Sequence, residues 1–131
     1  MASRRTSIYI DGFKHVNPIP AACVIDRVLV SGLVIGADPQ TGALPPSLPE
    51  QAANMYTHMR RIIEAAGGGL EDILKVTVWM NDRNAREAIN PGWLAMFPDE
   101  ASRPARATMS RVLGGEKLVE AEFVAILPEA S

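Results

Sequence analysis

The sequence predicts an α+β fold in which one mixed sheet is covered on one face by two helices. Short runs of β-branched residues occur before, between and after two longer stretches that have helical periodicity, so that each helical stretch stands between strands. A chain of 131 residues suits one domain, and no linker or low-complexity tract interrupts it. We therefore expect a single domain that spans residues 1–131.

The first part of the chain predicts three short strands. Residues 7–11 alternate between polar and apolar side chains, as a half-buried strand does. Residues 23–25 and 28–30 are rich in β-type side chains and flank Asp26 and Arg27, which predicts a hairpin with a two-residue turn. A proline-rich loop separates this hairpin from the first strand.

The longest helix is expected over residues 49–66. Ser47 and Glu50 have the spacing of a capping box, in which each side chain satisfies a free backbone N–H group of the other. The apolar residues of this stretch recur at steps of three and four: they are Ala52, Met55, Tyr56, Met59, Ile62, Ile63 and Ala66. Consecutive glycines from Gly67 onward supply the stop signal, because glycine tolerates the left-handed conformation at a helix end.

Four further elements complete the prediction. Residues 74–80 alternate as a strand, and residues 84–97 have helical periodicity that Pro91 should kink or split. Residues 106–112 and 118–126 predict two final strands, joined around a pair of glycines.

Two helices in one layer leave the second face of the sheet uncovered. If the last strand alternates, it presents apolar side chains on that face: Val119, Ala121, Phe123 and Ala125. A large exposed apolar face would aggregate, so we expect it to be buried against other subunits.

Composition and charge argue against several classes of function. The 13 basic and 15 acidic residues give a net charge of −2, which does not favour binding to nucleic acid. With two histidines and Cys23 as the single cysteine, neither a Cys/His metal site nor an internal disulfide is expected. No apolar run approaches the ~20 residues of a membrane span. No apolar stretch follows the basic N-terminus, so we expect a cytoplasmic protein without a membrane partner.

One arginine stands out as a candidate for binding chemistry. Alternation puts Arg106, Thr108 and Ser110 on one face of a strand, and it puts Glu120 and Glu122 on one face of the next. If these two strands pair as a hairpin, the arginine and a glutamate share one side of the sheet. An arginine there can hold a substrate carboxylate through paired hydrogen bonds. The alternative is a simple salt bridge between Arg106 and one of the glutamates.

Three other polar residues have weaker claims. His58 falls on the polar side of the long helix and is expected to be solvated. His15, in the proline-rich loop, either reaches a site or is a structural hydrogen-bond partner. Asn90 precedes Pro91, which disfavours helical geometry at Asn90, so its side chain either caps the kink or has a special purpose.

Seven short motifs, taken in order and spacing, resemble the reactive-intermediate deaminase family (Rid, also called YjgF-like). The motifs are Ser31-Gly32, Asp38-Pro-Gln-Thr-Gly42, Glu64-Ala-Ala-Gly67, Leu70-Glu-Asp-Ile-Leu-Lys-Val-Thr-Val78, Asn90, Arg103-Pro-Ala-Arg106 and Val119-Glu-Ala-Glu122. Members of this family are chorismate-mutase-like α+β homotrimers with ligand clefts between subunits, so the resemblance implies a homotrimer.

The resemblance also implies an activity. Many members hydrolyse 2-enamino or 2-imino carboxylic acids to an oxo acid and ammonia, without a metal or an organic cofactor. By this resemblance Arg106 matches the residue that holds the substrate carboxylate, and Glu120 matches the residue that positions water and relays protons. Asn90, Thr108 and the backbone of Gly32 match residues that line the cleft.

A narrower resemblance concerns the substrate. Residues 15–21 lack the ligand-facing tyrosine of the best-known branch of the family, and together with residues 93–98 they look more like the branch that contains 2-aminomuconate deaminases. Two alternatives stay open. One is a non-catalytic trimer that binds a small carboxylic acid or acts like a chaperone, and the other is a housekeeping deaminase of broad imine tolerance.

Overall fold

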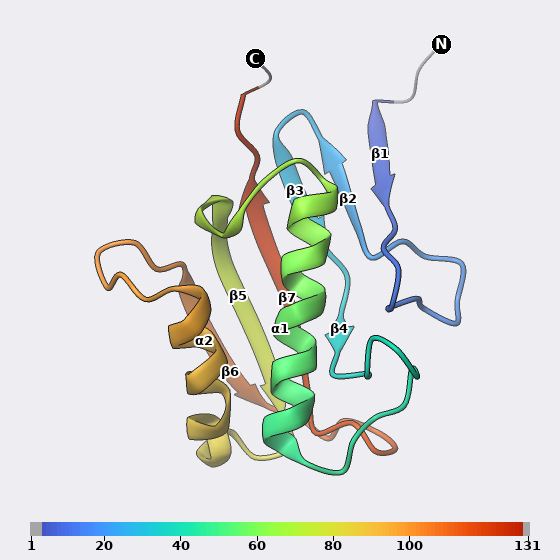
Figure 1. The fold of residues 1–131 in the computed structure, drawn as a ribbon, viewed down its shortest axis with the longest axis vertical. Helices are drawn as coiled ribbons and strands as arrows, with labels where there is room; N and C mark the ends of the chain where they lie inside the picture. The colour runs from blue at the N-terminus through green and yellow to red at the C-terminus, as the bar shows by residue number, and fades with distance from the viewer. Residues whose placement is uncertain (1–3, 130–131) are drawn as a thin grey trace.

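The computed structural model describes residues 4–129, which form one mixed sheet and one layer of helices (Figure 1). The strands are β1 (Arg5–Ile8), β2 (Ala22–Ile25), β3 (Val28–Ser31), β4 (Val34–Ile35), β5 (Ile73–Met80), β6 (Ala105–Ser110) and β7 (Val119–Ile126). The helices are α1 (Leu48–Ala65), α2 (Asn90–Met96) and the 3-10 helices η1 (Leu70–Asp72) and η2 (Arg83–Ile89). The strand order is β1-β2-β3-β7-β5-β6, with β4 paired to β7.

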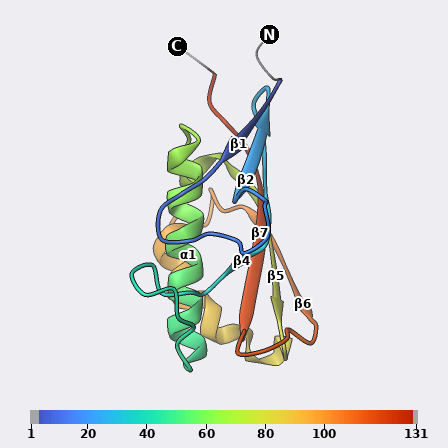
Figure 2. The same cartoon turned by 90° about the vertical axis from the view of Figure 1, so that its right-hand side faces the viewer.

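Both α-helices lie on the same face of the sheet, and the opposite face is bare (Figure 2). This arrangement confirms the predicted α+β class. The core between the sheet and α1 is built mainly from aliphatic side chains and methionines, including the fully buried Leu29, Met55, Met59, Ile62 and Val76. No helix in the described part of the chain is both long and apolar enough to cross a membrane.

The long helix forms as predicted because its signals are local. Ser47 is the N-cap, and its hydroxyl accepts a hydrogen bond from the Glu50 N–H at 3.3 Å. The apolar stripe faces the sheet and is buried. The chain leaves the helix through Gly67, whose φ of 88° is a conformation that favours glycine.

The predicted β2–β3 hairpin also forms, with Asp26 in the left-handed region at φ 53°. The two-residue strand β4 was not predicted. It arises because β3 pairs with β7 only as far as Val30, after which the Ser31 hydroxyl accepts a hydrogen bond from the Phe123 N–H at 2.8 Å in place of a backbone partner. The chain then returns to pair with β7 at Val34.

The second helical stretch is divided, as the proline suggested, but its first half is a 3-10 helix. The Asp82 carboxylate accepts from the Asn84 N–H at 2.9 Å and starts η2, and α2 begins at Asn90 with Pro91 in its first turn. A Cβ atom on Gly92 would lie 2.4 Å from a ring carbon of Tyr56. Only glycine therefore allows α2 to pack this closely against α1.

The predicted pairing of the last two strands was wrong. β6 pairs in parallel with β5, and β7 pairs antiparallel with the other side of β5, so β5 separates them. Val76 pairs with both Arg106 and Phe123, which puts these three residues on the helix-covered face. Since side chains alternate along β7, Glu120 lies on the opposite face from Arg106.

The predicted composition of the uncovered face was also wrong. The four residues expected there, Val119, Ala121, Phe123 and Ala125, are at most 1% exposed and pack in the core beneath the helices. The bare face instead presents the alternate residues. The large apolar side chains exposed on it are Val28, Val30, Met109 and Val124. An apolar surface that no helix covers is therefore present, as expected, but it is formed by the alternate residues of the strands.

Candidate functional site

Arg106 is held in a fixed orientation by α2. Its Nη2 donates a hydrogen bond to Asn90 Oδ1 at 2.9 Å, and its Cζ lies 4.9 Å from the centroid of the Trp93 ring. A guanidinium stacked on an indole gains cation–π attraction and loses freedom of rotation. Neither Glu120 nor Glu122 pairs with Arg106, so the salt-bridge alternative is wrong. Asn90 does not cap the kink and instead orients the arginine.

A neutral tyrosine lies behind this arginine. The Tyr56 hydroxyl donates to Ile89 O at 2.8 Å. Burial raises the pKa of Tyr56 to about 12, although the nearby charge of Arg106 acts in the opposite direction. Tyr56 is thus uncharged at physiological pH and provides no counter-charge. Nη1 of Arg106 is itself buried without a hydrogen-bond partner in the described part of the chain.

Arg106 and Thr108 border a polar hollow of about 460 Å³ with three residues of η2, namely Arg83, Asn84 and Arg86. No carboxylate from residues 4–129 lines this hollow, so it attracts anions. We call Arg106, Asn90, Thr108 and this hollow the arginine half of the candidate site. The sequence did not single out Arg83 and Arg86. The only available signal was that these two arginines stand three residues apart in the stretch before Asn90.

Glu120 is anchored on the bare face of the sheet. Its side chain is 5% exposed and forms an ion pair with Arg111. The Arg111 Cζ lies 4.6 Å from the Trp79 ring centroid, so the indole supports the arginine that holds the carboxylate. The Glu120 carboxylate therefore has a defined position at the edge of a cavity. A group that orients a water molecule needs such a fixed position.

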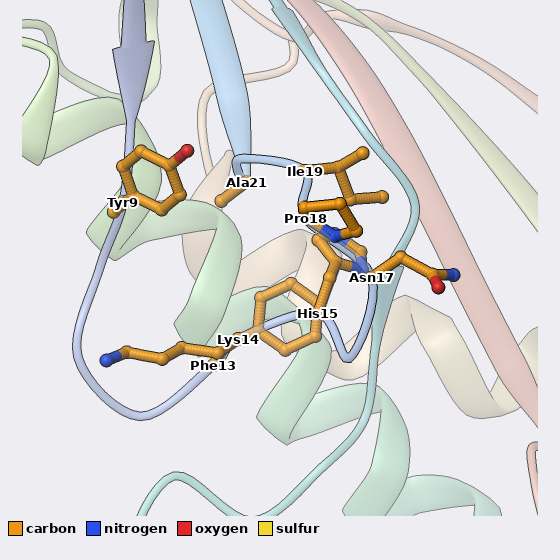
Figure 3. A pocket seen from close by; sticks show the side chains of 8 residues that line it. All are labelled: Tyr9, Phe13, Lys14, His15, Asn17, Pro18, Ile19 and Ala21. Carbon is orange, nitrogen blue, oxygen red and sulfur yellow. The ribbon is translucent and has the colours of Figure 1, made fainter.

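That cavity has a volume of about 410 Å³ and lies under the N-terminal loop. It is lined by Phe13, Lys14, His15, Val16, Asn17, Ile19, Leu33, Ile35, Lys117 and Glu120. Figure 3 shows the adjoining pocket of about 320 Å³, which shares Phe13, His15 and Ile19 with it. We call Glu120 and this cavity the glutamate half of the candidate site.

His15 contributes an unpaired nitrogen to the glutamate half. Its Nε2 is buried and has no hydrogen-bond partner among the described residues, and its ring meets the Phe13 ring edge-on at 4.9 Å between centroids. Burial lowers the pKa of His15, so its imidazole is neutral near pH 7. A Cβ atom on Gly32 would lie 3.7 Å from this nitrogen. The N–H of Gly32 donates to Ala21 O at 2.9 Å and is thus already engaged within the chain.

His58 is fully buried, and the prediction that it is solvated was wrong. The loop that follows β4 and the ring of Phe13 cover this side of α1. Nε2 of His58 donates to Ala37 O at 2.6 Å, and since a carbonyl only accepts, Nε2 carries the hydrogen. Nδ1 is buried without a partner.

The buried His58 predicts a loss of stability in weak acid. Burial is the main cause that lowers the pKa of His58 from its ordinary value of 6.5. The hydrogen bond to Ala37 O opposes this shift, the charge of Arg61 lowers the pKa by a smaller amount, and Asp38 raises it by the least. Below pH ~6.5 the unfolded chain binds the proton more readily than the folded one, so stability decreases as the pH falls from there toward the folded-state pKa.

We expect the melting temperature of the protein to fall between pH ~7.5 and ~5.5, and to fall less steeply in a His58→Gln variant. The variant should be less stable than the wild-type protein at every pH. The comparison therefore uses the slope of melting temperature against pH, which a uniform loss of stability leaves unchanged. Asp38 titrates in a lower pH range and is not expected to contribute here, because its hydrogen bonds from Gln40 and Thr41 lower its pKa. An unchanged slope in His58→Gln would contradict the assignment.

The residues predicted for the site fall into two groups on opposite faces of the sheet. Arg106, Asn90 and Thr108 belong to the arginine half, whereas Glu120 belongs to the glutamate half and Gly32 lies beside it. One chain therefore does not bring Arg106 and Glu120 into a common cavity. Among residues 4–129, no group of three or more His, Cys, Asp or Glu side chains is arranged to hold a metal ion.

Comparison with known proteins gives concordant results. The profile of the family described as "Endoribonuclease L-PSP" matches residues 13–127. The chain is 34% identical over 113 residues to a 2-iminobutanoate/2-iminopropanoate deaminase of Salmonella typhimurium, covering 85% of this chain and 88% of that one. It is 31% identical over 115 residues to a RutC family protein of Aquifex aeolicus, covering 83% and 92%. Among solved structures, RidA from an Antarctic Psychrobacter superposes with a TM-score of 0.85 at 27% identity, covering 93% and 99%.

Proposed function

We propose that this chain, which belongs to the endoribonuclease L-PSP family, is a hydrolytic deaminase of 2-enamino and 2-imino carboxylic acids. The family includes the Rid proteins, and this membership is the premise of the proposal. The observation that carries the proposal is Arg106, a guanidinium fixed by Asn90 and Trp93 at an anion-attracting hollow. The deaminase name of relatives up to 34% identical supports the same reaction.

In the proposed reaction Arg106 binds the carboxylate of the substrate through charge-assisted hydrogen bonds. An enamine first takes a proton at C3 and loses one from nitrogen, and so becomes the imine. Water then adds to C2 while one of its protons goes to the nitrogen, the proton of the resulting hydroxyl is transferred to the nitrogen as well, and the C–N bond breaks to release ammonia and a 2-oxo acid. Glu120 orients the water and moves its proton to the nitrogen, and fixing the carboxylate holds C2 against that water.

The proposed active site lies between subunits of a homotrimer. Arg106 and Glu120 are on opposite faces of the sheet, so a site that uses both needs the arginine half of one protomer and the glutamate half of a neighbour. The bare sheet face with its exposed Val28, Val30, Met109 and Val124 supports burial against other subunits. In this assembly Thr108 and Asn90 line the cleft from one side, and Gly32 lies at it from the other.

The finer proposal for the substrate is a 2-aminomuconate-like acid. It rests on the loop at residues 15–21, where the apolar Ile19 and the neutral His15 border the cavity next to Glu120. A trimer that binds small carboxylic acids without transforming them uses Arg106 in the same way. The buried, ion-paired Glu120 at the edge of a cavity favours the catalytic function.

The activity itself is tested with an imine made in the assay. An amino acid oxidase converts 2-aminobutanoate to 2-iminobutanoate, and semicarbazide traps whatever imine remains. We expect the purified protein to reduce the trapped imine and to speed the release of ammonia, in proportion to protein concentration. The heat-denatured protein is the control. Equal trapping with and without the native protein, for this imine and for unsaturated six-carbon enamines, would reject the deaminase.

A further inference from the structure

Two arginines beside Arg106 are not accounted for by the binding of one carboxylate. Arg83 and Arg86 border the same hollow as Arg106, and in the part of the chain that the structure describes no acidic side chain lines it. Within residues 4–129 none of these three arginines forms an ion pair, whereas three other arginines do. Three guanidinium groups thus surround one space without a counter-charge from the described chain.

The helix type brings Arg83 and Arg86 to the same side. They lie in η2, and in a 3-10 helix side chains three residues apart are stacked on one face. In a regular α-helix they would still be neighbours, but offset by about 60° around the axis. The Arg83 N–H donates to Ser110 Oγ at 3.0 Å, which attaches the start of η2 to the end of β6, the strand that carries Arg106. Arg86 Nη1 donates to Arg83 O at 3.2 Å.

We infer that Arg83 and Arg86 bind the second carboxylate of 2-imino or 2-enamino dicarboxylic acids, the class to which the proposed 2-aminomuconate-like substrate belongs, and so make such acids the preferred substrates. This inference rests on the proposed function, in which Arg106 takes the carboxylate next to the reacting carbon. The planar fork of a guanidinium matches a carboxylate, and two such forks at i and i+3 can share one. The second carboxylate of a dicarboxylic substrate neutralises part of the positive charge in the hollow. The alkyl end of a monocarboxylic substrate would instead displace water from the guanidinium groups without replacing the hydrogen bonds of that water.

The test compares two imines that differ in the second acid group. Glutamate oxidase supplies 2-iminoglutarate and an amino acid oxidase supplies 2-iminobutanoate, and kcat/KM is measured for each. The wild-type protein should prefer the dicarboxylic imine. In an Arg83→Gln/Arg86→Gln variant, the ratio of the two kcat/KM values should fall about ten- to hundredfold, mainly through KM for the dicarboxylic imine. The ratio does not depend on the fraction of folded protein, so partial misfolding does not imitate the effect.

Two further variants sharpen the result. Arg60→Gln removes an exposed arginine of α1 that does not line the hollow, and it should leave the ratio unchanged. Arg83→Lys/Arg86→Lys keeps the charge without the fork and should retain part of the preference. A wild-type ratio of one or less, or a double glutamine variant with the wild-type ratio, overturns the dicarboxylate inference while the deaminase stands. A protein that hydrolyses neither imine overturns both.

Discussion

Replacing Arg106 by glutamine is expected to lower kcat/KM for imine hydrolysis by about 10² to 10⁴-fold, because two hydrogen bonds to a charged group contribute ~1.5–3 kcal/mol each. The fold should persist, since within residues 4–129 the guanidinium makes a single side-chain hydrogen bond, to Asn90, and stacks on Trp93 at the rim of a hollow. Glu120→Gln should cause a comparable loss through kcat. Circular dichroism and the melting temperature check the fold of each variant.

Mixing these two inactive chains should restore activity. If each cleft takes Arg106 from one protomer and Glu120 from the next, a hybrid trimer has one cleft with both residues intact. Random assembly of equal amounts makes about three quarters of the trimers hybrid, so about one quarter of the wild-type activity should return. The subunits are exchanged by co-expression or by joint refolding.

In the matched control for this mixing experiment, both variants are altered in the same half of the site. A mixture of Arg106→Gln and Asn90→Ala chains contains no intact arginine half, because Asn90 orients Arg106 from within the same protomer. Its activity should not exceed the mean of the two parents. Restored activity in this control, or none in the Arg106→Gln/Glu120→Gln mixture, would falsify a site shared between neighbours.

The largest loss of stability is expected from Gln51→Leu. The Gln51 side chain is fully buried, and its Nε2 donates to Pro45 O at 2.8 Å and to Glu116 O at 2.9 Å. Its Oε1 accepts from the Leu118 N–H at 2.9 Å. Leucine would leave three backbone groups without a partner, so the free energy of unfolding should fall by about 2–5 kcal/mol. Urea denaturation at constant protein concentration measures this change.

The same substitution at Gln40 serves as the control. Gln40 lies in an exposed turn, where its backbone N–H rather than its side chain contacts Asp38. Gln40→Leu should change the free energy of unfolding by less than ~0.5 kcal/mol. Equal stabilities for the two variants would show that the Gln51 side chain does not join these segments.

Local signals made part of this fold predictable. The N-cap at Ser47, the apolar stripe of α1 and the β2–β3 hairpin are each encoded within a few consecutive residues, and each formed as expected. Of the predicted capping box, the bond to Ser47 is the half that is present. The order of the strands is not local. Nothing within residues 105–126 indicates that β5, some thirty residues earlier, separates β6 from β7. In the register of these pairings, Arg106 and Glu120 lie on opposite faces of the sheet.

The candidate site was predictable to the same extent. Sequence resemblance pointed to Arg106, Asn90, Thr108, Glu120 and Gly32, and their roles remain predictions. The partner of Glu120 and the burial of His58 were not predictable. Arg111 reaches Glu120 from just beyond the end of β6; it fell within the strand predicted over residues 106–112, where nothing marked it as the partner of Glu120. The burial of His58 depends on a loop that folds over the polar side of α1. The periodicity of a sequence does not show which distant segments will contact each other.

The placement of Arg106 and Glu120 on opposite faces of one sheet has an evolutionary consequence in the proposed assembly. After a gene duplication, one copy can lose its arginine half and the other its glutamate half, and mixed rings still contain working clefts. Selection would then preserve both genes, because neither product is sufficient alone. A fold that divides its catalytic pair in this way gives a lineage a short route from a self-associating enzyme to an obligate partnership of paralogues.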